Sequence, residues 1–139
     1  MRYNRGIREY MHLHQKARDF KTTVLWLHGL TGTGKSTLAR NIAETHYERP
    51  AYYKQQGNWW CGYSGEDVVI WDDFSGAHYQ TILNVTDRYP LLVQSKGGNN
   101  NFLAKLLIFT SNQKPEEVYS ERTEVSALLR RINLILEIL

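Results

Sequence analysis

The chain has 139 residues, of which 42% are hydrophobic and 22% are charged, and its formal net charge is +3. This length suits one core of roughly 100–200 residues, and no apolar run approaches the roughly 18 residues that a membrane span requires. We therefore expect one soluble domain. The polar residues 1–20 argue against a secretory signal. The single cysteine, Cys61, can form no internal disulfide, which agrees with a reducing compartment, and we expect its thiol to be packed.

The positive charge is concentrated in the first segment of the chain. Residues 1–21 contain six basic and two acidic side chains, whereas the other residues contain eleven basic and twelve acidic ones. Apolar residues in this segment recur at roughly helical spacing. We expect a linker or short helical oligomerisation segment over residues 1–21, followed by the folded domain over 22–139. A second basic window, free of acidic residues, lies between Asp87 and Glu116 and can carry a local positive field.

The folded part alternates apolar, β-branched runs with segments of helical periodicity. Because the apolar runs are near-continuous and separated by helices, they favour a parallel sheet covered on both faces. The predicted fold class is α/β, a three-layer sandwich with a central, mainly parallel sheet. In chain order we predict a strand at 23–27, a helix at 36–47, a strand at 51–53, a loop at 55–66, a strand at 67–71, a helix at 77–87, a hairpin at 90–102 with Lys96–Asn99 at its tip, a strand at 104–110, a helix at 123–130 and a strand at 132–139. The asparagine run at 99–101 is expected to be loop.

A phosphate-binding loop follows the first predicted strand and opens the first predicted helix. Its glycines allow successive backbone N–H groups to point at phosphate oxygens, and the helix N-terminus adds partial positive charge. We expect Lys35 to reach the β- and γ-phosphates of ATP and the Ser36 hydroxyl to bind Mg²⁺. The expected nucleotide-binding residues are Gly29, Leu30, Thr31, Gly32, Thr33, Gly34, Lys35, Ser36 and Thr37.

Two further apolar strands end in polar side chains that suit the same site. Asp72 and Asp73 follow the strand at 67–71, and Asn112 follows the strand at 104–110. We expect Asp72 to anchor Mg²⁺ together with Ser36, and Asp73 to polarise the attacking water. Asn112 is a candidate for holding that water or touching the γ-phosphate. Lys35, Asp73 and Asn112 are therefore candidate catalytic residues.

The order of these motifs resembles the superfamily 3 helicases of small DNA viruses. More narrowly, it resembles the Rep proteins of circular single-stranded DNA viruses such as circoviruses and nanoviruses, over about residues 22–131. The residues that carry the resemblance are Gly57-Asn58-Trp59-Trp60-Cys61-Gly62-Tyr63-Ser64-Gly65-Glu66, Asp72-Asp73-Phe74, Asp87-Arg88-Tyr89-Pro90, Lys96-Gly97-Gly98 and Thr110-Ser111-Asn112-Gln113.

The resemblance implies a P-loop NTPase fold of the AAA+ type and a motor that hydrolyses ATP with Mg²⁺. It further implies translocation on single-stranded DNA during rolling-circle replication, a homo-oligomeric, hexameric ring, and action in the host nucleus. Family members usually carry an upstream nuclease domain, for which this chain has no room, so the chain is expected to be an excised fragment or a shortened relative.

The resemblance also assigns two sites outside the phosphate loop. The family's hairpin lysine, which holds the DNA backbone, corresponds to Lys96, with Gly97 and Lys105 as further candidates for DNA contact. A mobile cation on a glycine-flanked tip suits phosphate without reading sequence. The family's arginine finger, which acts on the neighbouring subunit's ATP, corresponds to Arg131, or to Arg130 if the match slips by one position.

Two other functions compete with the motor. A P-loop kinase would pass phosphate to a small acceptor, but it needs an arginine-rich mobile lid, and no such insertion occurs in the sequence. A nucleotide-gated DNA-binding module would assemble on DNA without needing turnover. ATP hydrolysis measured with and without single-stranded DNA distinguishes the three.

Overall fold

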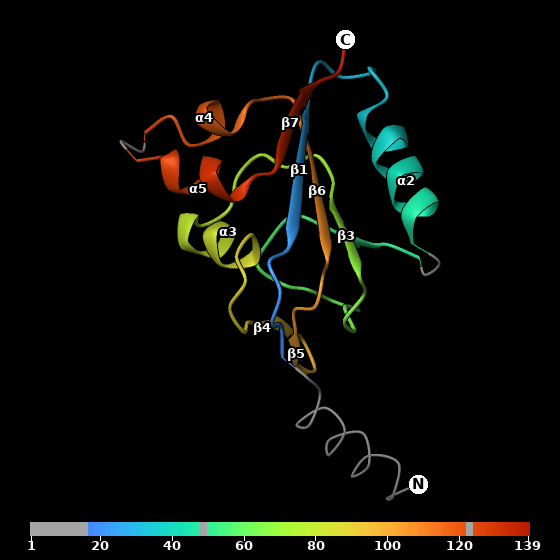
Figure 1. The fold of residues 1–139 in the computed structure, drawn as a ribbon, viewed down its shortest axis with the longest axis vertical. Helices are drawn as coiled ribbons and strands as arrows, with labels where there is room; N and C mark the ends of the chain where they lie inside the picture. Colours follow the sequence, from blue (N-terminus) through green and yellow to red (C-terminus); the bar gives the residue numbers. More distant parts are fainter. Residues whose placement is uncertain (1–16, 48–49, 122–123) are drawn as a thin grey trace, which may run out of the picture.

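The computed structural model describes residues 17–47, 50–121 and 124–139. Within these residues the chain forms a five-stranded sheet in the order β2-β3-β6-β1-β7, with parallel neighbours throughout. Helix α2 covers one face, and α3, α4 and α5 lie on the other side (Figure 1). The predicted three-layer α/β arrangement is confirmed. The elements are β1 (Thr23–His28), α2 (Lys35–His46), β2 (Tyr52–Lys54), β3 (Val68–Trp71), α3 (Tyr79–Val85), β4 (Leu92–Ser95), β5 (Gly98–Asn101), β6 (Leu106–Ser111), α4 (Pro115–Val118), α5 (Ser126–Arg131) and β7 (Leu134–Glu137).

The two faces of the sheet bury different side chains. Strand residues alternate between the faces, so β1, β3 and β6 each contribute to two clusters. Beneath α2 the cluster is aliphatic, and the helix fits closely because Ala39 and Ala43 are small and buried. The opposite face is aromatic: the ring of Phe109 stacks on Trp26 at 4.9 Å and on Trp71 at 5.7 Å between centroids. This burial on both faces explains the uninterrupted apolar runs of the three central strands.

The hairpin of β4 and β5 lies at the end of the sheet opposite the loop between β1 and α2 (Figure 1). Ser95 pairs with Gly98, so Lys96 and Gly97 alone form its tip. The prediction that the asparagine run at 99–101 is loop is wrong, and so is the four-residue tip that included Gly98 and Asn99. These residues form β5 because the backbone groups of β4 offer them a complete antiparallel partner.

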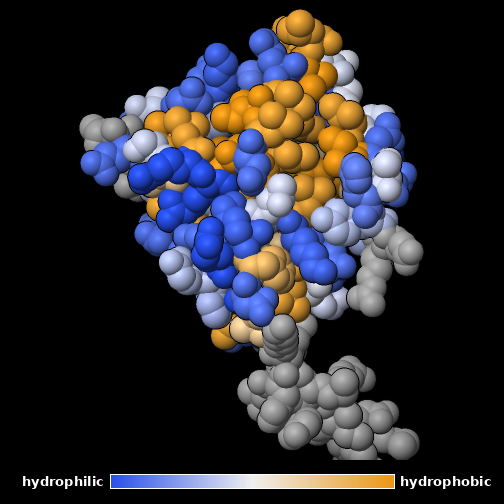
Figure 2. All heavy atoms as spheres, in the orientation of Figure 1, coloured by the Kyte–Doolittle hydropathy of each residue, from blue (hydrophilic) through white to orange (hydrophobic). Residues whose placement is uncertain are grey.

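Strand β7 differs from the covered strand that the sequence predicts. It lies at the edge of the sheet, and all four of its residues are exposed. Leu134 is 47% exposed, and the apolar area along this edge is visible in Figure 2. The apolar run therefore predicts the strand correctly and its burial wrongly, because only β1 flanks it in the described part of the chain.

Three other local features differ from the prediction. The helix predicted at 77–87 is shorter, since α3 covers only Tyr79–Val85. The short helix α4 was not predicted; it begins at Pro115 and is capped by the Glu117 carboxylate, which accepts a hydrogen bond from the Lys114 N–H at 2.9 Å. Cys61 is exposed rather than packed.

The segment before β1 is attached to the domain through the side chain of Arg18. The guanidinium of Arg18 is buried, where it donates to the carbonyl oxygens of Asn84, Val85 and Tyr89. Burial lowers the pKa of the Arg18 guanidinium. The predicted helical or linker segment lies mostly in residues 1–16, outside the described residues. Across the described ranges, no helix is long and apolar enough to cross a membrane.

Candidate nucleotide-binding site

The loop between β1 and α2 has the backbone conformation that a phosphate cradle requires. Gly34 caps α2 in the left-handed region with φ 87°, where a side chain would be strained. At Gly29, where φ is 157°, an added Cβ would lie 2.3 Å from the carbonyl oxygen of Ile138. Glycine is thus required at both positions, once for the turn and once for the close approach of the chain after β7. The loop delivers its backbone to the N-terminus of a 12-residue helix.

The ammonium group of Lys35 is held by the loop that precedes it. Its Nζ donates to the carbonyl oxygens of Gly29 at 2.8 Å and Leu30 at 3.0 Å, and to Oδ1 of Asn112 at 3.2 Å. Lys35 is only 6% exposed, although it is charged. The cation from α2 and the amide after β6 therefore meet at one point, as the sequence predicts.

Asp72 connects the helix to the sheet. Its Oδ1 accepts hydrogen bonds from the Ser36 hydroxyl at 2.6 Å and from the Thr110 hydroxyl at 2.7 Å. Carboxylate and hydroxyl oxygens are the ligands that Mg²⁺ takes in phosphate sites, so the donor set of Ser36 and Asp72 fits this ion. Ser36 lies at the start of α2 and Asp72 directly follows β3, so both lie at the carboxyl ends of the parallel strands.

Asp73 lies just beyond β3 in an unusual conformation. Its φ of 50° is the only positive value for a non-glycine residue among the described residues. The Asp73 N–H donates to the Thr110 hydroxyl at 2.9 Å, and its carbonyl oxygen accepts from the Gln56 amide at 2.5 Å. These bonds turn the chain, so Asp72 and Asp73 both lie near the loop although adjacent strand residues point to opposite faces.

A pocket of about 220 Å³ lies between the loop, the start of α2, Asp73 and Asn112; Asp72 is bonded to Ser36 at its border but does not line it. Leu30 does not line it, and its side chain is 79% exposed; Gly29 and Thr33 belong to the loop but also lie outside the lining. The predicted residues that line the pocket are Thr31, Gly32, Gly34, Lys35, Ser36, Thr37, Asp73 and Asn112.

Sequence reasoning missed Thr110 as a site residue. Because Trp71 of β3 pairs with Phe109 of β6, the next residues, Asp72 and Thr110, lie side by side. Thr110 is buried, and its hydroxyl contacts both carboxylate-bearing residues. The register of the two strands could have indicated it, but that register follows from the fold and not from the motif. Gln56 was also missed, since nothing in a glycine-punctuated loop marks one glutamine.

The predicted DNA-contacting residues lie apart from this pocket. Lys96 and Gly97 are exposed at the hairpin tip, and Lys105 is exposed just before β6. Both lysines are therefore at the opposite end of the strands from the glycine-rich loop (Figure 1). The surface that carries Lys96 and Lys105 is therefore separated from the pocket beside the glycine-rich loop by the length of the strands.

The two arginines at the end of α5 have different environments. Arg131 forms an ion pair with Asp87 at 3.1 Å and donates to the Ala127 carbonyl oxygen at 2.7 Å. Arg130 is exposed, and within the described part of the chain its side chain has no hydrogen bond or ion pair. Neither arginine lines the pocket of the same chain.

Comparison with known proteins agrees with this geometry. A family model described as RNA helicase matches residues 25–113, which include the glycine-rich loop, both aspartates and Asn112. The chain belongs to this family of superfamily 3 helicase domains. The helicase domain is similar to the replication-associated protein of goose circovirus, with 47% identity over 94% of the chain and 44% of that protein.

Further relatives and solved structures extend this result. The replication-associated protein of porcine circovirus 1 is 44% identical over 94% of the helicase domain, and that of human associated cyclovirus 1 is 39% identical over 96%. The chain spans half the length of these relatives or less. Yeast Hsp104 bound to ADP is similar in fold, with a TM-score of 0.54 and 18% identity over 95% of this chain and 25% of that one. The fold is thus the AAA+ type of P-loop fold.

Proposed function

We propose that this domain is the ATP-hydrolysing motor of a viral replication-initiator protein and that it translocates on single-stranded DNA. The observation that carries the proposal is the convergence of Lys35, Asn112 and the Ser36–Asp72 pair at one edge of the sheet. A cation, an amide and a hydroxyl–carboxylate pair are the groups that a magnesium-bound triphosphate requires. Each comes from a different element, and only the folded sheet brings them together.

Each group has a distinct role in the proposed hydrolysis. The backbone N–H groups of residues 29–34 and the ammonium of Lys35 bind and orient the phosphates. Ser36 and Asp72 would hold Mg²⁺, which supplies positive charge opposite the oxygens that become more negative during transfer. Asp73 accepts a hydrogen bond from the attacking water and orients it. Asn112 contacts Lys35 and directly follows β6, so it is positioned to bind the γ-phosphate or the attacking water and to link the presence of that phosphate to β6.

The hairpin supports DNA as the polymer on which the motor acts. Lys96 is exposed on a two-residue tip, so its ammonium can reach a phosphate without a steric barrier. Gly97 has no side chain and leaves space for the DNA backbone, and Lys105 adds a second positive charge on the same side of the domain. A phosphate contact of this kind is independent of sequence, as translocation requires. We propose that the domain acts in the nucleus as part of a longer protein with an upstream nuclease domain.

The proposed ring supplies the remaining catalytic charge. An arginine acts on a nucleotide in trans only if a neighbouring copy brings it there, which favours a closed, hexameric assembly. Arg131 and Arg130 are the two candidates. Arg130 is the freer of the two, because Arg131 is held by Asp87 of its own chain.

Steady-state ATP hydrolysis with and without single-stranded DNA tests the proposal. A motor hydrolyses ATP faster when the strand is present, and Lys96→Ala removes the stimulation while basal hydrolysis remains. Hydrolysis that single strands never stimulate, accompanied by transfer of phosphate to a small acceptor, would indicate a kinase instead. Nucleotide-dependent assembly on DNA without hydrolysis would indicate an assembly module.

A further inference from the structure

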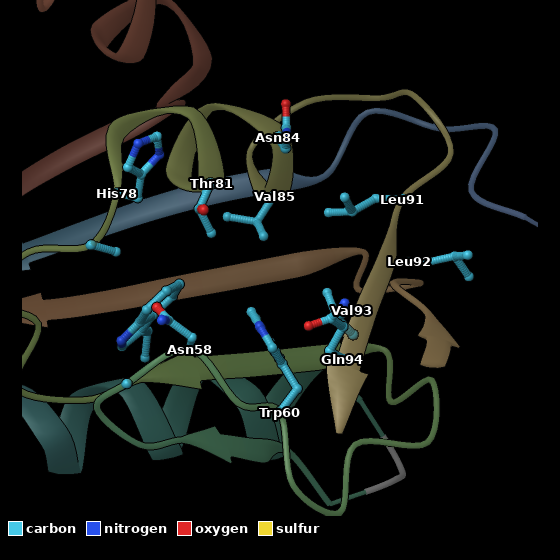
Figure 3. Close-up of a pocket in the computed structure, with 13 residues that line it drawn as sticks. Asn58, Trp60, His78, Thr81, Asn84, Val85, Leu91, Leu92, Val93 and Gln94 are labelled. Carbon is cyan, nitrogen blue, oxygen red and sulfur yellow. The ribbon is translucent and has the colours of Figure 1, made fainter. Parts of the chain in front are cut away.

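A second, larger pocket lies on the aromatic side of the sheet. Its volume is about 520 Å³, within the roughly 300–1,000 Å³ typical of ligand sites. Helix α3 forms one wall, strand β4 of the hairpin forms another, and the loop before β3 closes the floor (Figure 3). In Figure 3 the side chains of Thr81 and Val85 extend from α3 toward Trp60 across the pocket. The site that binds the triphosphate does not share any of the lining residues.

The lining of this pocket carries side-chain amides, and its one ionisable residue is His78 at the start of α3. None of the described residues that line it is an aspartate, glutamate, lysine or arginine. Asn58 and Gln94 each offer both a donor and an acceptor, and Thr81 offers a hydroxyl. The Asn84 amide points away from the pocket (Figure 3), where it accepts a hydrogen bond from the Gln80 amide at 2.9 Å. Such a wall binds a neutral group that has donors and acceptors along its edge, and it disfavours a phosphate or an ammonium group.

One buried donor in this lining has no partner. Among the described residues, Nε1 of Trp71 is the buried side-chain nitrogen or oxygen atom that lacks a hydrogen bond. Trp71 is 2% exposed and lines the pocket. Buried indole N–H groups usually find an acceptor, because leaving one unpaired is unfavourable. An acceptor such as a carbonyl oxygen on a ligand would remove that cost.

The floor of the pocket is firmly built. The Trp60 N–H donates to the Gln94 carbonyl oxygen at 2.8 Å, which joins the loop to the hairpin. Behind the floor, Nζ of Lys54 lies 5.2 Å from the ring centroid of Trp60 and 4.9 Å from that of Trp71. Burial lowers the pKa of the Lys54 ammonium group. One face of each indole ring is therefore covered by Lys54.

The pocket is close to the proposed phosphate contact of the hairpin. Gln94 lines the pocket from β4, and Lys96 follows two residues later at the tip. With a rise of about 3.3 Å per residue, the two positions are separated by about 7 Å along the hairpin. A strand whose phosphate binds Lys96 therefore presents its neighbouring nucleotides to the mouth of this pocket.

We propose that this pocket receives an unpaired nucleobase of the strand whose phosphates the hairpin holds. The inference rests on the proposed function, since it needs a single strand at Lys96. A nucleobase is planar and uncharged, its edge carries carbonyl oxygens and amino groups, and side-chain amides pair with such edges. Because Trp71 ends the strand that leads to Asp72, an occupied pocket also contacts the element that bears the metal-binding carboxylate.

Two oligonucleotides separate base binding from phosphate binding. One is a fluorescent oligo-dT, and the other is a strand of equal length made of abasic sites, with the same phosphates. Binding is measured by fluorescence anisotropy with Mg²⁺ and a non-hydrolysable ATP analogue. We expect the unmodified protein to bind oligo-dT about tenfold more tightly than the abasic strand, as one recognised base edge provides.

Two variants test whether this preference arises in the pocket. Thr81→Phe fills the pocket from an exposed position of α3, and Gln94→Ala removes an amide while its backbone bond to Trp60 remains. Each should reduce the oligo-dT preference to about twofold or less and leave affinity for the abasic strand unchanged. Thr45→Phe, on the exposed side of α2, is the matched control and should behave like the unmodified protein.

The outcomes also separate this inference from the proposed function. An equal affinity of the unmodified protein for both strands, or an unchanged preference in both pocket variants, would overturn the nucleobase site and leave the motor intact. Binding of neither strand at any nucleotide state would overturn both proposals.

Discussion

Arg131 and Asp87 form an ion pair that joins the end of α5 to the segment just before the hairpin. Nη2 and Nε of Arg131 lie 3.1 Å and 3.3 Å from the same carboxylate oxygen, Oδ2 of Asp87. The backbone on either side is also connected, because Lys21 donates to the Arg131 carbonyl oxygen and the Thr22 N–H donates to the Asp87 carbonyl oxygen. Helix α5 and the segment before the hairpin are therefore joined by both side-chain and backbone hydrogen bonds.

This ion pair predicts different consequences for the two neighbouring arginines. Arg131→Ala leaves Asp87 without its partner and should lower the free energy of unfolding by about 1 kcal/mol, given a partly exposed pair. Arg130→Ala removes an exposed side chain that has no partner among the described residues, and it should change the free energy of unfolding by less than about 0.5 kcal/mol. Chemical denaturation of both variants measures the difference. Equal destabilisation would contradict the structural role of the pair.

The same two variants identify the trans-acting arginine. If Arg130 acts on the neighbouring subunit, Arg130→Ala should lower DNA-stimulated turnover by about 10³-fold, the lower end for such residues. Mixing it with Asp73→Asn subunits should restore part of the activity, because some interfaces regain both groups. If only Arg131→Ala recovers on mixing, Arg131 is the finger and its pairing with Asp87 breaks in the ring.

Lys35→Ala should abolish ATP turnover. The ammonium group is buried among oxygen atoms, so its removal leaves the phosphates without their main cation, and we expect a loss of more than about 100-fold. Phosphate release measured at saturating ATP provides the test. Arg40→Ala, on the exposed side of the same helix, is the control and should retain full activity. Comparable losses in both variants would indicate damage to α2 rather than to the site.

Lys96→Ala should weaken DNA binding without reducing basal hydrolysis. Loss of one phosphate contact lowers affinity for all sequences alike and reduces the slope of log affinity against log salt by about 1. A salt titration of binding to a fluorescent single strand measures that slope. Lys105→Ala should give a similar but smaller change, because it is away from the tip. An unaltered slope for Lys96→Ala would argue against the hairpin as the DNA contact.

Thr110→Val tests the residue that the fold adds to the site. Valine keeps the shape of threonine but cannot bond Asp72 or the Asp73 N–H, so the carboxylates lose their orientation. We expect Mg²⁺ affinity in the presence of nucleotide to fall about 10- to 100-fold, as for other residues that orient ligands. Thermal unfolding serves as the control, since an unfolded variant would lose the site altogether. Normal Mg²⁺ affinity in a folded Thr110→Val protein would show that the hydroxyl is dispensable.

Much of the candidate nucleotide site could be predicted because its motifs are local. Gly34, Lys35 and Ser36 lie together in sequence, and Asp72 and Asn112 are marked as polar ends of apolar strands. Their meeting follows from one rule, that the carboxyl ends of parallel strands share one edge of a sheet. The sequence could therefore indicate the set before the strand order was known.

The remaining features depend on which segments pack together. The role of Thr110 requires the register between β3 and β6, and the pairing of Arg131 requires contact between α5 and the base of the hairpin. Strand β5 is formed by asparagines that disfavour strands on their own but gain a partner in β4. The burial of β7 was predicted wrongly because an apolar run does not reveal whether a neighbour covers it.

The binding of a fluorescent ATP analogue with and without Mg²⁺ tests the central claim most directly. We predict that the unmodified protein binds it more tightly with Mg²⁺, and that Asp72→Asn loses this gain but keeps the weaker, metal-independent affinity through the glycine-rich loop. Affinity that does not respond to Mg²⁺, or that responds equally in Asp72→Asn, would contradict the assignment of this edge of the sheet as a magnesium–nucleotide site.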